Sequence, residues 1–204
     1  MDDSDIPQLS PETLAILQEV LLAQQNTVQT HEQEDWRLAQ FWYTDETQEK
    51  LAEEAITQSN GGKIAICSAP SLYFKLKDMG YEDRCFLFEY DQRFENECLP
   101  GHFQFFSIDD IDEIPKKHQH QYDCVIIDPP RLNKETTAAA IHMLQNLSHT
   151  NDTPCILITA GWLEDEIRAK YNYNVADFQP TNKQLKNPMR AYTSYASPAL
   201  GVLN

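Results

Sequence analysis

An aspartate and two prolines close a short apolar run near the middle of the chain. Asp123 to Ile127 is a predicted strand, and Asp128-Pro129-Pro130 follows it directly. The two prolines end the hydrogen-bond ladder and hold the backbone rigid. The Asp128 carboxylate and the Pro129 carbonyl are acceptors, and acceptors aimed at an amino group orient its lone pair toward an electrophile in line. We therefore expect chemistry on an amino nitrogen, with a helix-capping aspartate as the alternative.

A turn of small residues follows the first predicted strand, which ends at Cys67. The turn consists of Ser68, Ala69, Pro70 and Ser71. Small side chains let a ligand approach the backbone, and the exposed N–H groups at the start of the next helix can bind a carboxylate. The glycine pattern of dinucleotide-binding turns is missing here. A ligand-binding turn and a plain tight turn are equally compatible with these residues.

Acidic residues follow the second and third predicted strands. Glu89 comes about 20 residues after the first turn, the spacing at which a carboxylate accepts hydrogen bonds from ribose hydroxyls. Asp91 is the second candidate for that role, and Asp109 lies in a polar stretch where an adenine amino group could bind. Solvated acids at strand ends are the alternative, because the whole chain is acidic.

Short apolar runs alternate with amphipathic segments, which predicts strands alternating with helices. The central runs are apolar throughout, as in strands that helices cover on both faces. The predicted strands are residues 63–67, 84–88, 103–106, 123–127, 155–159, 173–178 and 191–196. No clear helix separates the last two, so we expect an antiparallel pair. The predicted fold class is α/β, with a Rossmann-like, mostly parallel seven-stranded sheet and helices on both faces.

Capping signals delimit two of the predicted helices. Thr44 can cap a helix that precedes the first strand, and the pair Gly61-Gly62 is expected to end it. Asn133 can cap a second helix that runs to about Leu147.

Charge divides the chain into two parts. Sixteen Lys and Arg stand against 32 Asp and Glu, a net charge of -16. The first 35 residues hold eight acids and no Lys or Arg, and a helix is predicted to begin near Ser10-Pro11. We expect an acidic N-terminal helical extension with its linker at 1–35 and a catalytic domain at 36–204. Such a charge repels nucleic acid and attracts a basic macromolecule.

The cysteines and the N-terminus predict a cytoplasmic protein. The five cysteines form no C-x-x-C pair, and buried reduced thiols are expected. The first residues are acidic and no apolar run approaches the length that spans a bilayer. We expect a monomer without a metal site, and we expect His118 and His120 to be solvated loop residues.

Four segments together resemble a known enzyme family. They are Trp36-x-x-x-Gln40-Phe41-Trp42-Tyr43, Cys67-Ser68-Ala69-Pro70-Ser71, Phe88-Glu89-Tyr90-Asp91-x-Arg93-Phe94 and Asp128-Pro129-Pro130. The motif D-P-P-[FYW] after the fourth strand is typical of methyltransferases that act on amino groups. The combination resembles the eukaryotic lysine methyltransferases of translation elongation factor 1-alpha, formerly named as adenine-specific DNA methyltransferases, over nearly the whole chain.

The resemblance implies a class I methyltransferase with S-adenosylmethionine as cofactor and a lysine of elongation factor 1-alpha as substrate. Asp128, Pro129 and Pro130 are then the catalytic residues. The residues implied to bind the cofactor are Thr44, Ser68, Ala69, Pro70, Ser71, Glu89, Asp91 and Asp109.

The chain departs from the family motif at its fourth position, where Arg131 replaces Phe or Tyr. An aromatic face would stack on a base or attract an ammonium, and arginine cannot hold a cation. Three interpretations follow. In the first, Arg131 swings outward and Phe41, Trp42 or Tyr43 supplies the aromatic face. In the second, Arg131 lies near the substrate lysine and lowers the pKa of that lysine, and in the third, activity is lost. Trp162, after the fifth strand, lines the substrate mouth or packs in the core.

Two other functions are compatible with the motif. One is methylation of an adenine amino group in nucleic acid, against which the net charge and the missing aromatic residue argue. The other is a binding module without catalysis on the same scaffold.

Overall fold

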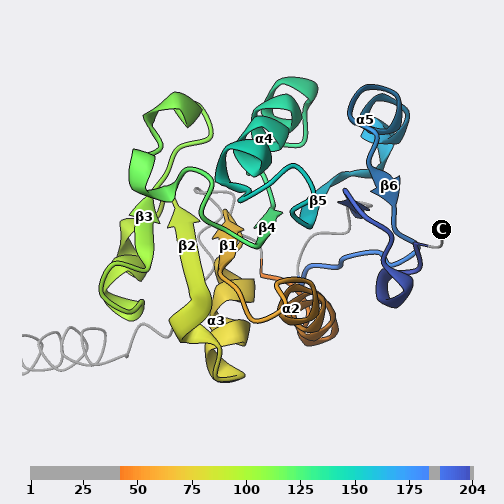
Figure 1. Ribbon diagram of the computed structural model, residues 1–204. Helices are drawn as coiled ribbons and strands as arrows, with labels where there is room; N and C mark the ends of the chain where they lie inside the picture. Colours follow the sequence, from red (N-terminus) through yellow and green to blue (C-terminus); the bar gives the residue numbers. More distant parts are fainter. Residues whose placement is uncertain (1–41, 184–188, 203–204) are drawn as a thin grey trace, which may run out of the picture. The chain divides into compact units, whose positions relative to one another are not determined.

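The computed structural model describes residues 42–183 and 189–202 of the chain (Figure 1). The predicted N-terminal helix and Phe41 lie outside the described residues. Within the described ranges, strands and helices alternate along the chain in the order that the sequence predicts.

One sheet of seven strands runs through the described residues, in the order β3-β2-β1-β4-β5-β7-β6. The strands are β1 Ile64–Cys67, β2 Cys85–Glu89, β3 Phe103–Phe105, β4 Cys124–Ile127, β5 Cys155–Ala160, β6 Asn174–Val175 and β7 Met189–Thr193. The first five are parallel to one another, and β7 pairs antiparallel with β5 and β6. The predicted mostly parallel sheet and its antiparallel edge are confirmed.

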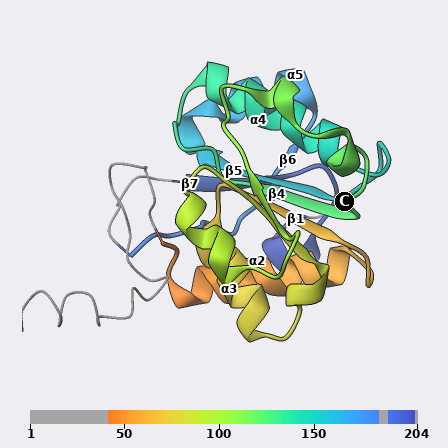
Figure 2. The same cartoon turned by 90° about the vertical axis from the view of Figure 1, so that its left-hand side faces the viewer.

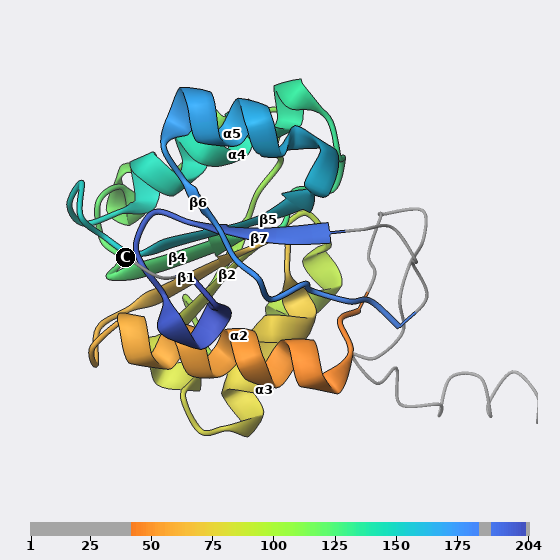
Figure 3. The ribbon, with the colours of Figure 1, turned by 90° about the vertical axis from the view of Figure 1, so that its right-hand side faces the viewer.

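Helices cover both faces of this sheet, as predicted. Figures 2 and 3 show α2 and α3 on one face and α4 and α5 on the other. Their bounds are α2 Asp45–Gln58, α3 Pro70–Asp78, α4 Lys134–Leu147 and α5 Glu164–Tyr171. Short 3-10 helices are η2 Glu82–Arg84, η3 Gln92–Glu97, η4 Ile111–Glu113, η5 Lys116–His118, η6 Gly161–Leu163 and η7 Pro198–Leu200. None of the helices in the described ranges has the length and apolar character needed to cross a membrane.

Alternate residues of the central strands face the two helical layers. Ile64 and Ile66 of β1 pack in the core that includes residues of α2 and α3, whereas Ala65 and Cys67 pack in the core that includes residues of α4. All four are 0% exposed. Both faces of β1 are removed from water, so burial of each side chain stabilises the fold, by about 1.5–3 kcal/mol for an isoleucine. This explains the continuous apolar run.

Side chains cap two helices as predicted. The Thr44 hydroxyl accepts a hydrogen bond from the Thr47 amide at 3.4 Å. Asn133 Oδ1 accepts one from the Thr136 amide at 2.8 Å. Each cap satisfies an amide that has no partner within its own helix.

The end of α2 differs from the prediction. The helix ends at Gln58, before the predicted glycine pair, and Ser59 is its C-cap. Asn60 and Gly61 then adopt positive φ angles of 47° and 86°. Asparagine tolerates this left-handed conformation, so the reversal begins one residue before the first glycine.

The last two strands are also shorter or shifted relative to the predicted 173–178 and 191–196. β6 keeps only Asn174–Val175, because the Phe178 amide donates to the Leu200 carbonyl at 3.1 Å and the chain leaves the sheet. β7 ends at Thr193, whose hydroxyl donates to the Tyr195 carbonyl at 2.6 Å.

His118 is buried, so the prediction of a solvated histidine was wrong for this residue. Its side chain is 5% exposed, its Nδ1 lies 2.7 Å from the Tyr122 hydroxyl, and its ring packs edge-on against Phe88. Burial lowers the pKa of His118 to about 4, so it is neutral at pH 7. The polar residues around it in the sequence concealed an aromatic cluster that forms only in the folded chain.

All five cysteines are free thiols. Cys98 is half-buried, and the other four are buried in strands of the sheet. Burial raises the pKa of the Cys67 and Cys124 thiols well above the usual value, which makes them unreactive.

Gly62 lies directly against Asp123 at the amino ends of β1 and β4. A Cβ at position 62 would lie 2.1 Å from Asp123 Oδ2 and 2.7 Å from Asp123 Cβ. Oδ2 also accepts a hydrogen bond from the Lys63 amide at 2.8 Å, so the carboxylate is not free to move away. We expect Gly62→Ala to lower the free energy of unfolding by about 1–3 kcal/mol, measured by urea denaturation.

The double variant Gly62→Ala/Asp123→Ala provides the control for this effect. The added methyl group should cost less in that background, because the clashing carboxylate is gone and only the contact with the Cβ of residue 123 remains. An unchanged denaturation midpoint for Gly62→Ala alone would contradict the close contact.

Candidate active site

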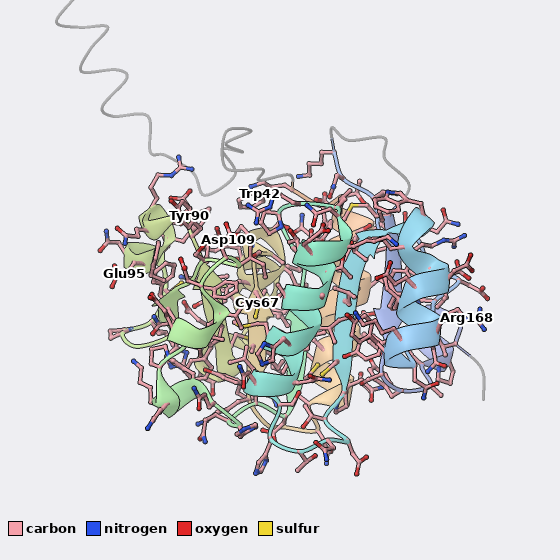
Figure 4. All side chains as sticks on the ribbon, turned by 90° about the horizontal axis from the view of Figure 1, so that it is seen from above. Trp42, Cys67, Tyr90, Glu95, Asp109 and Arg168 are labelled. Carbon is pink, nitrogen blue, oxygen red and sulfur yellow. The ribbon has the colours of Figure 1, made fainter. Side chains whose placement is uncertain are left out.

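The predicted site lies where the strand order reverses. β1 and β4 are neighbours in the sheet, and β1 continues into α3 on one face while β4 continues into α4 on the other. Open α/β sheets bind ligands in the crevice at this point, beyond the carboxyl ends of the strands. The Asp128 amide donates to the Cys67 carbonyl at 3.0 Å, so the two loops begin side by side. Figure 4 shows Trp42, Tyr90 and Asp109 toward the same edge of the sheet.

The Asp128 carboxylate lies at this edge and is held by a tyrosine. Its Oδ2 accepts a hydrogen bond from the hydroxyl of Tyr43, which is 1% exposed. Removal from water raises the pKa of Asp128 to about 7, the hydrogen bond from Tyr43 opposes this rise, and the negative charge of Glu89 adds to it. Burial raises the pKa of Tyr43 well above its usual value, so its hydroxyl stays protonated and acts as the donor.

The two prolines of the motif follow Asp128 without regular secondary structure. Pro129 is buried and Pro130 is half-buried. Proline has no amide proton, so this corner presents backbone acceptors and no donor from either residue. Together with the Asp128 carboxylate, the corner can therefore orient the N–H bonds of a bound amino group.

The turn after β1 has the features of a backbone anion site. Ser68 has a positive φ of 54°, and its amide donates to the Phe88 carbonyl at 2.9 Å. Pro70 is the first residue of α3, and its N-cap, Ala69, supplies no side-chain hydrogen bond. The first turn of α3 thus has no side-chain cap, and the dipole at its amino end suits a carboxylate. Ser71 is buried, and its hydroxyl accepts from the Tyr43 amide at 3.5 Å.

Glu89 ends β2 at the same edge and is 5% exposed. Its Oε1 accepts hydrogen bonds from the amides of Tyr90 at 2.9 Å and Asp91 at 3.1 Å. These bonds fix the orientation of a buried carboxylate at the predicted ribose position. The geometry suits vicinal hydroxyl donors, and ribose binding stays a prediction.

Asp91, the second candidate for the ribose, is already engaged within its own turn. It caps η3, and its carboxylate accepts from the Arg93 amide at 3.0 Å and from Arg93 Nε at 2.8 Å. These contacts account for its burial, so Glu89 is the better candidate.

Asp109 and Arg131 form an ion pair across the edge of the site. Arg131 Nη1 donates to Asp109 Oδ2 at 3.2 Å, and Nη2 donates to Oδ1. Arg131 Nε also donates to the Thr136 hydroxyl at 3.3 Å. Both carboxylate oxygens of Asp109 are therefore engaged, and binding an adenine amino group would require this pair to share or release one. The guanidinium lies against Asp109, and the three interpretations of Arg131 stay predictions.

The remaining candidates occupy different environments. Trp42 is 5% exposed and stacks on Phe74 of α3, which leaves little of its ring open to a substrate. Thr44 caps α2, and its hydroxyl lies 2.9 Å from that of Thr181. Trp162 is 63% exposed just after β5, so the core-packing alternative was wrong and a place at the substrate mouth stays a prediction.

Sequence similarity identifies the family. The model of a family described as "Probable N6-adenine methyltransferase" matches residues 34–197. The chain is 39% identical to EEF1A lysine methyltransferase 1 of Gallus gallus, covering 96% of this chain and 97% of that one. The human protein of the same name is 32% identical, covering 97% and 96% of the two chains. The chain belongs to the EEF1A lysine methyltransferase 1 family.

A solved structure agrees with the fold of this family member. The branched-chain polyamine synthase from Thermus thermophilus, solved with N4-aminopropylspermidine and 5'-methylthioadenosine, superposes with a TM-score of 0.56. It is 10% identical, and the match covers 93% of this chain and 67% of that one. At this identity the likeness concerns the fold alone.

Sequence reasoning missed how the segment before α2 is anchored in this methyltransferase. Tyr43 forms a bridge with Asn182, the Lys183 amide donates to the Trp42 carbonyl at 2.9 Å, and the Thr44 amide donates to the Thr181 carbonyl at 2.9 Å. Reasoning from local patterns cannot find a contact between segments so far apart in the chain.

The exposed ion pair of Arg131 predicts a small effect of its removal. Both side chains are about half exposed or more, and such pairs contribute about 0.2–1 kcal/mol to stability. We expect Arg131→Ala to change the melting temperature little and to keep methyl-transfer activity within about tenfold of the wild type. Loss of activity by roughly a hundredfold in a folded variant would instead show that Arg131 acts on substrate or cofactor.

Proposed function

We propose that this chain transfers a methyl group from S-adenosylmethionine to a lysine of translation elongation factor 1-alpha. The observation that carries the proposal is the Asp128-Pro129-Pro130 corner at the point where the strand order reverses, beside the turn after β1. The names of the relatives support the substrate, because they describe EEF1A lysine methyltransferase 1 in chicken and human.

The residues at the carboxyl edge fit S-adenosylmethionine. The uncapped first turn of α3 suits its carboxylate, and the buried Glu89 carboxylate suits the ribose hydroxyls. When bound there, the cofactor supplies a methyl group on a positively charged sulfur. Thr44, the turn from Ser68 to Ser71, Asp91 and Asp109 complete the proposed cofactor side.

Asp128 acts in this proposal as an orienting acceptor rather than as a strong base. Its pKa of about 7 lies far below that of a lysine, about 10.4, so it cannot retain a proton taken from the ammonium. Forming the neutral amine at pH 7 costs about 4 to 5 kcal/mol, and the proton leaves to water before transfer. The Asp128 carboxylate and the Pro129 carbonyl then hold the amine so that its lone pair faces the methyl group.

The charge of the chain supports a basic protein partner. With a net charge of -16, the protein attracts a basic surface and repels phosphate backbones. We propose that residues 36–204 form the methyltransferase domain, that residues 1–35 are an acidic extension, and that the protein is a cytoplasmic monomer. Phe41 and Trp162 are the proposed substrate side, whereas the rings of Trp42 and Tyr43 are buried and Arg131 is paired with Asp109.

A labelling experiment with three acceptors tests the proposed function. The full chain is incubated with labelled S-adenosylmethionine and, separately, with purified elongation factor 1-alpha, protein-free RNA and protein-free DNA. We expect label in the protein factor alone. Label in RNA or DNA alone would establish the adenine alternative. No label in any acceptor, together with no cofactor binding by calorimetry, would establish a non-catalytic module.

A further inference from the structure

The hydrogen bond between Tyr43 and Asp128 joins two segments 85 residues apart. Tyr43 lies just before α2, and its ring is buried in the core. Asp128 is half-buried at the end of β4. Among the described residues, Asp128 Oδ2 accepts from Tyr43 and no hydrogen bond to Oδ1 is found. One carboxylate oxygen is therefore held and the other is available to a substrate amine.

The backbone holds the tyrosine in place as firmly as its ring does. The Tyr43 carbonyl accepts from the Gln48 side chain at 2.7 Å, and its amide donates to the Ser71 hydroxyl at 3.5 Å. These two contacts and the buried ring hold the phenol donor in place. A fixed donor on one oxygen restricts rotation of the Asp128 carboxylate, and orientation of this kind contributes to catalysis.

The same contact favours the charged form of the carboxylate, against the burial that raises the pKa of Asp128. The groups that act on Asp128 are Tyr43 from the segment before α2 and Glu89 from β2. Arg131, three residues further on, is turned toward Asp109 and Thr136. Glu89 disfavours the ionised form of Asp128, whereas the phenol donor favours it.

We infer that Tyr43 is a positioning residue for methyl transfer, whose hydroxyl holds one oxygen of the Asp128 carboxylate and aims the other at the amine. The inference rests on the proposed function for the identity of the acceptor. The role belongs to the hydroxyl of Tyr43 and not to its ring, because phenylalanine would fill the same space without donating a hydrogen bond.

Tyr43→Phe tests this role through the pH dependence of kcat/KM. The value of kcat/KM rises with pH as the substrate lysine loses its proton. In the wild type, ionisation of Asp128 should add a break to this rise near pH 7. Loss of the donor raises the pKa of Asp128, and we expect the break to move upward by about one pH unit. At pH 7 the ionised fraction, and with it kcat/KM, should fall about fivefold, and at pH 9 the two enzymes should nearly agree.

Tyr195→Phe is the matched control. The Tyr195 hydroxyl also donates to a carboxylate, Oε1 of Glu54 at 2.8 Å, in a part of the core away from Asp128. Its pH profile should superpose on that of the wild type. A uniform loss of rate for Tyr43→Phe at every pH, or an unmoved break, would overturn the inference and leave Tyr43 a packing residue.

A second readout keeps the test independent of the protein substrate. The Asp128 side-chain carboxyl is followed by carbon-13 NMR during a pH titration of the wild type, Tyr43→Phe and Tyr195→Phe. A higher titration midpoint in Tyr43→Phe alone supports the inference, whether or not elongation factor 1-alpha is labelled. Absence of label in that factor would reject only the proposed function. Equal midpoints in all three proteins would reject the role of Tyr43 while leaving the proposed function intact.

Discussion

Asp128→Ala is expected to lower kcat for methylation of elongation factor 1-alpha by roughly 10²–10³-fold, the loss typical when one oriented polar contact to the reacting group is removed. The Pro129 carbonyl remains, but a single acceptor leaves the amine free to rotate away from the line of transfer. Cofactor affinity should change by only a few-fold, because Asp128 is proposed to contact the amine. Single-turnover kinetics with saturating S-adenosylmethionine measure the effect on the chemical step.

The control for this prediction is Asp152→Ala. Asp152 is an exposed acid near the amino ends of the strands, and its removal changes the net charge by the same amount. This variant should keep the wild-type rate. If Asp128→Ala folds normally by circular dichroism and still labels the substrate at the wild-type rate, the orienting role assigned to Asp128 is wrong.

Glu89→Gln is expected to weaken S-adenosylmethionine binding by roughly 10- to 150-fold, because hydrogen bonds to a charged acceptor contribute about 1.5–3 kcal/mol. The amide keeps the volume of the side chain, so the buried end of β2 should stay packed. Isothermal titration calorimetry gives the dissociation constant, and kcat at saturating cofactor should fall much less than kcat/KM.

The pH profile of Glu89→Gln provides an independent check of the electrostatics. Glu89 raises the pKa of Asp128 by its negative charge, so the variant should shift the break of the kcat/KM profile to lower pH. This direction is opposite to that expected for Tyr43→Phe. Asp91→Asn tests the second ribose candidate, whose carboxylate already holds Arg93. Cofactor binding that is weakened by Asp91→Asn and not by Glu89→Gln would reverse the assignment.

The central sheet could be predicted because its strands are buried on both faces. The four residues of β1 and the four of β4 form continuous apolar runs. Such runs predict buried strands from the local sequence alone. The site residues at the strand ends were predicted for a related reason. Parallel strands bring their carboxyl ends to one edge, so Ser68, Glu89 and Asp128 meet there whatever the loops contain.

The contacts that sequence reasoning could not supply are those between distant segments. Tyr43 and Asp128 are 85 residues apart in the sequence. Arg131 and Asp109 are 22 residues apart. No local sequence pattern predicts either contact. His118 was misjudged because its neighbours in the sequence are polar while its neighbours in space are aromatic. Packing between distant segments determines the surroundings of these residues, and a local sequence pattern carries no information about that packing.

A crystal structure of the full chain with S-adenosylhomocysteine and a peptide that carries the labelled lysine tests the central claim most directly. The lysine nitrogen should lie within roughly 2.7–3.2 Å of Asp128 Oδ1 and of the Pro129 carbonyl, with the sulfur of the cofactor product on its open side. A lysine bound away from this corner, or a corner filled by the protein's own side chains, would contradict the account.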